Sequence, residues 1–148
     1  MTEADSVASL LEQIGAEQRR LRGLLTGRDP SLLAGRTPAG KWSVAENVRH
    51  LLFAEQAHLG RLLPGGPQWS TLGLPPTGMQ RQERFRAMAS AAPSIEDVFD
   101  AWSVAHASTR ELAGRDTEEV RKALTRNLKH LRSHVTLIER LLRVRAGR

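Results

Sequence analysis

Histidines supply the clearest candidate chemistry in this sequence. His130 and His134 are four residues apart in a segment whose apolar residues recur with helical spacing. Their side chains should therefore project from one helix face, about one turn apart, and converge on one divalent ion. The spacing alone is a weak signal, because a metal centre needs a third ligand. The alternative is that both are boundary histidines with backbone or water partners.

A third ligand is expected from an earlier helix. His50 lies on the side of that helix opposite its leucine stripe, but its neighbours there are the apolar or small residues Phe53, Ala54 and Ala57. A helix with such residues on both sides is packed within a bundle. We therefore expect His50 to point between helices, where it can join His130 and His134 around one ion.

Two glutamates share the helix of His50. Glu46 lies one turn before His50 and could orient its imidazole or accept a proton as a catalytic residue. Its simpler role is to complete a capping box with Ser43. Glu55 falls in the middle of the leucine stripe, where an unpaired carboxylate is costly. We expect Glu55 to pair with an arginine of the first or the last helix.

The remaining histidines and the tryptophans have mainly structural expectations. His106 lies within the apolar stripe of a later helix, where a lone histidine is usually structural; the alternative is a fourth ligand or a group that contacts a ligand. His58 is a weaker candidate for the same role. The three tryptophans, Trp42, Trp69 and Trp102, are expected to anchor packing.

Composition excludes several other kinds of site. The chain has 148 residues and no cysteine, so it has no disulfide, no thiol nucleophile and no cysteine-ligated metal. It contains neither a glycine-rich phosphate loop nor a Gly-x-Ser-x-Gly elbow. Leu131 follows His130, so the sequence has no HExxH motif. Histidines and carboxylates must carry the chemistry, and a mononuclear metal site is the expected form.

Length and hydropathy bound the organisation of the chain. One domain over residues 1–148 is expected, because domains cluster near this size. The longest uncharged stretch, residues 62–79, holds four prolines and four glycines and cannot form a transmembrane helix. The first residues lack the layout of a secretory signal, so a cytoplasmic location is expected.

Helices must position the candidate residues. Apolar spacing, capping residues and Gly or Pro stops predict four long helices. They are expected at residues 7–27, 43–63, 94–114 and 117–142. A loop is expected at 28–42, an irregular connection at 64–78 and a short helix at 79–91. The predicted fold class is all-α, a four-helix bundle in up-down-down-up order with a long connection between the second and third long helices.

Two motifs resemble a known family. Residues 42–51 read Trp-Ser-Val-Ala-Glu-Asn-Val-Arg-His-Leu and are followed by Glu55, and the late motif is His130-x-x-x-His134. Together they resemble the DinB-like superfamily of bacterial four-helix-bundle metalloproteins, over nearly the whole chain in helix order and length. The resemblance implies that His50, His130 and His134 bind a divalent ion, commonly nickel, zinc or iron.

The resemblance also implies an activity. Characterised relatives include S-transferases that use a low-molecular-weight thiol such as bacillithiol, mycothiol or glutathione, a thiol-dependent maleylpyruvate isomerase, and metal-dependent hydrolases. It therefore implies a metal-dependent thiol transferase or hydrolase that acts on a small molecule, and a homodimer. The family name implies a link to stress or DNA damage, which concerns expression. Many members carry Asp after the first late histidine and Gly-Gln or a similar pair after the second, whereas this chain has Leu131 and Val135-Thr136.

The charge distribution supports a different class of function. The formal net charge is +6, and over residues 121–148 nine basic residues face only Glu139. One alternative is a bundle that binds nucleic acid or an acidic partner through this segment. Another is a metal-free bundle that dimerises through an apolar surface. A solvated helix face explains the same pattern more simply. Arg49 and Arg126 are candidates, by proximity in the sequence, for holding the carboxylates of an acidic thiol.

Overall fold

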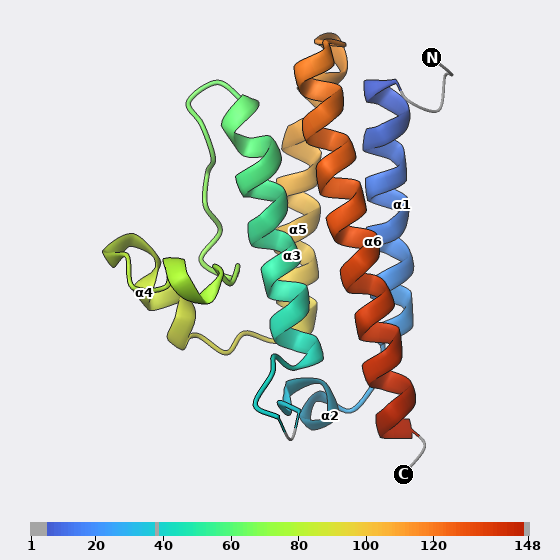
Figure 1. Cartoon of the computed structure of the whole chain (residues 1–148), viewed down its shortest axis with the longest axis vertical. Helices are drawn as coiled ribbons and strands as arrows, with labels where there is room; N and C mark the ends of the chain where they lie inside the picture. The colour runs from blue at the N-terminus through green and yellow to red at the C-terminus, as the bar shows by residue number, and fades with distance from the viewer. Residues whose placement is uncertain (1–5, 38, 147–148) are drawn as a thin grey trace.

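Four long helices lie side by side in the computed structural model, which describes residues 6–37 and 39–146 (Figure 1). In Figure 1, α1 and α6 run downward, whereas α3 and α5 run upward. The described residues contain no strand, so the helical class is confirmed. The long helices are α1 (Val7–Leu25), α3 (Val44–Leu59), α5 (Ile95–Ser108) and α6 (Glu118–Ala146).

Capping residues set the starts of the long helices. The Ser43 hydroxyl accepts from the Glu46 backbone N–H at 3.1 Å, and the Glu46 carboxylate accepts from the Ser43 N–H at 3.0 Å. This reciprocal pair confirms the predicted capping box of α3. Ser94 caps α5 in a similar way, through the Asp97 N–H at 3.2 Å. These caps therefore fix the residue at which α3 and α5 each begin.

The core lies between the four long helices. The predicted stripe of α6 is buried, and each of its members is 5% exposed or less. These residues are Val120, Leu124, Leu128, Leu131, Val135, Ile138 and Leu142. Helix α3 has buried residues on both sides, including Leu52 and Phe53 at successive positions. The expectation that α3 is packed within the bundle is confirmed, and this helix carries His50.

Shorter elements differ from the expectations. The segment after α1 contains a helix, α2 (Pro30–Ala34), that starts at an Asp29 cap and was expected to be loop. The short helix α4 (Glu83–Ser90) begins later than residue 79, because Thr77–Met79 forms a separate 3-10 turn, η3. The other 3-10 segments, η2 (Gly60–Leu62) and η4 (Thr109–Gly114), extend α3 and α5.

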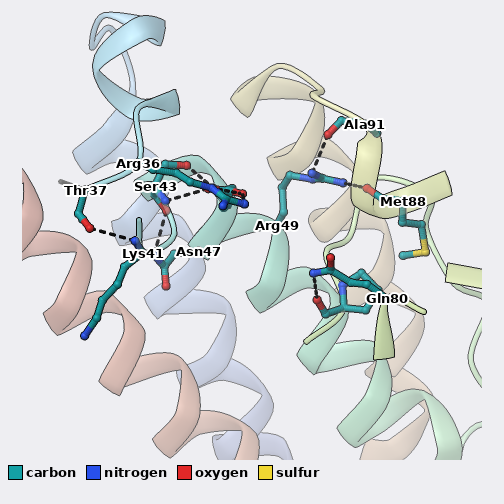
Figure 2. A network of polar contacts seen from close by, with 11 residues as sticks. Arg36, Thr37, Lys41, Ser43, Asn47, Arg49, Gln80, Met88 and Ala91 are labelled. Carbon is teal, nitrogen blue, oxygen red and sulfur yellow. Dashed lines mark hydrogen bonds and ion pairs between the residues drawn. The ribbon is translucent and has the colours of Figure 1, made fainter. Parts of the chain in front are cut away.

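Arg49 attaches the long connection between α3 and α5 to the bundle. Its guanidinium donates to the carbonyls of Leu72 and Ala91, each at 2.9 Å, and to those of Gly73 at 3.1 Å and Met88 at 2.6 Å. Figure 2 shows the bonds to Ala91 and Met88. Arg49 is 5% exposed, and each of its three guanidinium nitrogens donates to a backbone carbonyl of the connection. The idea that it holds a carboxylate of a small thiol is therefore wrong.

A small second core lies under the same connection. Phe53 of α3 stacks on Trp69 with ring centroids 4.7 Å apart, and Phe85 of α4 meets both rings edge-on. Trp69 and the buried Trp102 thus pack as expected. None of the helices in the described residues is both long and apolar enough to span a membrane.

Candidate metal centre

Three histidines from two neighbouring helices meet within the bundle. His50 comes from the middle of α3, and His130 and His134 come from successive turns of α6. One ring nitrogen from each lies within 4.8 Å of the other two. The ring centroid of His50 is 5.2 Å from that of His130 and 5.4 Å from that of His134, and the last two are 4.4 Å apart. These residues, the histidine trio, are close enough to share one metal ion.

Hydrogen bonds orient two rings of the trio. His50 Nδ1 lies 3.1 Å from the Leu74 carbonyl oxygen, and His134 Nδ1 lies 2.9 Å from Asn47 Oδ1. The Asn47 amide is itself oriented, because its Nδ2 donates to the Ser43 carbonyl at 2.9 Å. Both partners are acceptors, so each Nδ1 carries the proton and donates. The Nε2 lone pairs of His50 and His134 are then left for a metal ion.

His130 provides the observation that tests whether a metal fits. Its Nδ1 is the one buried side-chain nitrogen or oxygen without a hydrogen-bond partner among the described residues. Buried polar atoms are nearly always satisfied, so an unpartnered one needs an explanation. An ion that the trio shares and that binds this nitrogen would supply the missing partner. The donor set therefore fits a divalent cation that accepts imidazole ligands.

Burial also keeps the trio in its metal-binding protonation state. Burial, together with the nearby His134, His50 and His58 rings, lowers the pKa of His130 to about 4. Burial is likewise the main cause that lowers the pKa values of His50 and His134 below their ordinary value. Near neutral pH the three imidazoles are uncharged, and a neutral imidazole is the form that coordinates a metal.

A pocket of about 610 Å³ opens beside His134 and Asn47. Trp42 and two leucines of α6 form apolar parts of its wall, and the Trp42 ring lies 5.1 Å from that of His50. Trp42 therefore packs against the trio. The full lining is Arg36, Thr37, Gly40, Lys41, Trp42, Asn47, Thr77, Gln80, His134, Leu137 and Leu141. Figure 2 shows two of these lining residues, Thr37 and Lys41, where the Lys41 N–H donates to Thr37 Oγ1 at 3.1 Å. A volume of this size suits a small-molecule substrate.

Glu46 is held at the start of α3. Besides the capping box, its carboxylate pairs with the Arg36 guanidinium at 2.8 Å. Burial raises the pKa of Glu46, but the hydrogen bonds from Arg36 and Ser43 outweigh burial and leave it below its ordinary value. No hydrogen bond joins Glu46 to any of the trio in the described part of the chain. Its contacts are those of a capping residue.

Glu55 and His106 form a separate buried pair. The Glu55 carboxylate accepts from Trp102 Nε1 at 3.0 Å and lies 2.8 Å from His106 Nδ1. The expected arginine partner is therefore wrong, because α5 brings an indole and an imidazole to this carboxylate. The other nitrogen of His106, Nε2, lies 3.1 Å from the Leu11 carbonyl oxygen. Both ring nitrogens are thus engaged away from the trio, and His106 is not a fourth ligand.

Two asparagines have roles that the sequence reasoning missed. Asn47 orients His134, and Asn127 Oδ1 lies 3.0 Å from His58 Nδ1. The contact of His58 with the trio is a ring–ring contact with His130, with centroids 5.7 Å apart. The available signal was the polar Asn47, about one turn before His50 on a helix that is packed on both sides. A buried amide next to an imidazole marks an orienting hydrogen bond.

Fold and site together define a class: a helical protein in which two adjacent long helices place three neutral imidazoles beside a pocket. The chain belongs to the DinB superfamily, whose family model matches residues 13–138. Comparison with curated proteins and with solved structures gave no match.

Proposed function

We propose that this chain is a divalent-metal-dependent enzyme that acts on a small molecule. In this proposal the ion is held by His50, His130 and His134. The observations that carry it are the meeting of the three imidazoles and the His130 ring nitrogen that has no protein partner. Membership of the DinB superfamily supports the same conclusion.

An ion on three imidazoles keeps a coordination position for water or a substrate group and lowers the pKa of the group bound there. The residues of the chain would supply the rest. Asn47 and the Leu74 carbonyl hold two rings at fixed angles. The apolar side chains of Trp42, Leu137 and Leu141 limit the water around a bound substrate. Glu46 has a structural role here, as the cap of α3.

We further propose thiol transfer as the reaction, with hydrolysis as the second candidate. The chain has no cysteine, so a nucleophilic thiol must come from a second small molecule. A pocket of about 610 Å³ has room for a low-molecular-weight thiol beside a small electrophile. The ion, nickel, zinc or iron in the proposal, would favour the thiolate form. A homodimer also stays a prediction.

The test is a pair of activity assays on metal-loaded protein. Wild type loaded separately with nickel, zinc or iron should consume a small thiol and an electrophile in equal amounts, and His134→Ala should lose this activity. His106→Gln is the control and should retain the activity, because both ring nitrogens of His106 are engaged away from the trio. Hydrolysis of ester or amide substrates without thiol consumption would support the second candidate. Equal activity of wild type and His134→Ala would contradict a metal-dependent mechanism.

A further inference from the structure

A second, smaller pocket lies where the C-terminal end of α3 faces the first turns of α6. Its volume is about 240 Å³, and its lining is mostly basic. The residues that line it are His58, Arg61, Glu119, Lys122, Ala123 and Arg126. Three of these carry a permanent positive charge and one carries a carboxylate. We call this the anion pocket, for the reasons that follow.

Two partly buried contacts hold the walls of the anion pocket together. His58 of α3 is bonded through Nδ1 to Asn127 of α6, whose side chain is 3% exposed. The Arg115 guanidinium, just before α6, donates to the Leu62 carbonyl just after α3. Each contact joins the end of α3 to the beginning of α6. The pocket is therefore preformed, and binding need not order its walls.

The charges around the pocket are only partly compensated. Lys122 pairs with Glu118 at 3.3 Å, and both side chains are 76% exposed. The guanidinium groups of Arg61 and Arg126 form no ion pair or hydrogen bond with any residue that the structure describes. Glu119 is the only carboxylate of the lining and offsets one charge. Cations that face one hollow repel each other, and an anion between them removes that repulsion.

We propose that the anion pocket binds a small oxyanion, a phosphate or a carboxylate group, through Arg61 and Arg126. A guanidinium matches the geometry of both groups with two parallel N–H donors. The pocket is smaller than those that enclose drug-sized ligands, so it suits a free oxyanion or one anionic end of a larger molecule. This site goes beyond the metal-dependent reaction. It adjoins the metal centre through His58, which forms its wall and contacts the His130 ring.

Calorimetric titration of the purified protein at low ionic strength tests the proposal. Inorganic phosphate and malonate serve as probes in separate titrations and distinguish a phosphate source from a carboxylate source. We expect one saturable site for at least one probe. Arg61→Gln and Arg126→Gln should each weaken binding about tenfold, because each removes a charge-assisted contact. Both residues are exposed, so both variants should fold, as circular dichroism can verify.

Two control variants separate binding in the anion pocket from a general charge effect and from the metal centre. Arg140→Gln removes the same charge from an exposed position of α6 outside the pocket and should leave binding unchanged. His134→Ala removes a residue of the trio and should still bind the probe, so failure of the proposed enzyme function would not affect this result. Absence of saturable binding for both probes would overturn the proposal. It would also be overturned if Arg140→Gln weakened binding as much as Arg126→Gln. Binding of a short DNA duplex that both variants weakened equally would likewise overturn it, because that result would indicate a general charge effect.

Discussion

Asn47 links the backbone of the α3 cap to an imidazole of the trio. Its Nδ2 donates to the Ser43 carbonyl, and its Oδ1 accepts from His134 Nδ1. The side chain is 2% exposed, so water cannot replace these bonds. A single amide therefore sets the tautomer and the angle of His134.

Replacement of Asn47 should weaken metal binding without removing a ligand. For Asn47→Ala we expect a loss of about 10- to 100-fold in metal affinity, the usual effect of removing a group that orients a metal ligand. A competition titration with a chelator measures this change. Asn127→Ala is the matched control, because that amide contacts His58 and not the trio. Equal losses in the two variants would contradict a specific role for Asn47.

The Glu55–His106 pair should make stability depend on pH. Burial lowers the pKa of His106, but its hydrogen bond and attraction to Glu55 outweigh burial and raise it above the ordinary value, while Arg110 opposes them. The stabilising contribution is therefore complete below the unfolded-state pKa of about 6.5 and is lost as pH rises through the folded-state pKa. The bond of His106 Nε2 to the Leu11 carbonyl also raises this pKa, whereas the Trp102 indole that donates to Glu55 does not titrate.

Urea unfolding of wild type and His106→Gln at several pH values measures this contribution. The variant should be less stable by about 1–3 kcal/mol just below the unfolded-state pKa of about 6.5, where His106 is protonated in the folded protein. The difference should become smaller above the folded-state pKa of His106. A difference that is constant from acid to alkaline pH would show that His106 contributes through packing alone.

At the scale of elements, Arg49 joins α3 to the connection that leads to α5. Arg49→Met keeps an unbranched apolar side chain but leaves four backbone carbonyls without their donor. We expect a loss of about 2–5 kcal/mol in the free energy of unfolding, since unsatisfied buried acceptors are costly. Thermal unfolding measures this loss, and the exposed Arg140→Met serves as control. A change as small as that of the control would contradict the anchoring role.

Neighbouring carboxylates compensate part of the positive charge of α6. Several of its cations contact carboxylates, on α6 itself, on the turn before it or on α1. These pairs are Arg121–Asp116, Lys122–Glu118 and Arg132–Glu17. They leave less uncompensated charge for a nucleic acid than the composition indicates. The Arg145 side chain and Arg148 lie outside the described residues.

At the scale of the whole molecule, local signals predicted the long helices well. The capping box at Ser43 and the apolar stripe of α6 are encoded within a few turns, and the structure contains both. The partner of Glu55 was not predictable in this way. It depends on how α5 is positioned against α3, which brings Trp102 and His106 to the carboxylate. The role of Arg49 depends on the path of a connection with no periodic pattern.

The histidine trio could be predicted from local signals only in part. Local spacing placed His130 and His134 on one face, but only the packing of α3 against α6 decides whether His50 joins them. The structure brings the three rings together. That the trio binds a metal remains the central claim of the account.

Elemental analysis of purified wild type and His134→Ala tests that claim most directly. The account predicts close to one nickel, zinc or iron ion per wild-type chain, and loss of most of it in the variant. His106→Gln should keep the ion, because His106 contacts Glu55 and Leu11 instead of the trio. Wild-type protein that stays metal-free after incubation with each of these ions, or His134→Ala that retains a full equivalent, would contradict it.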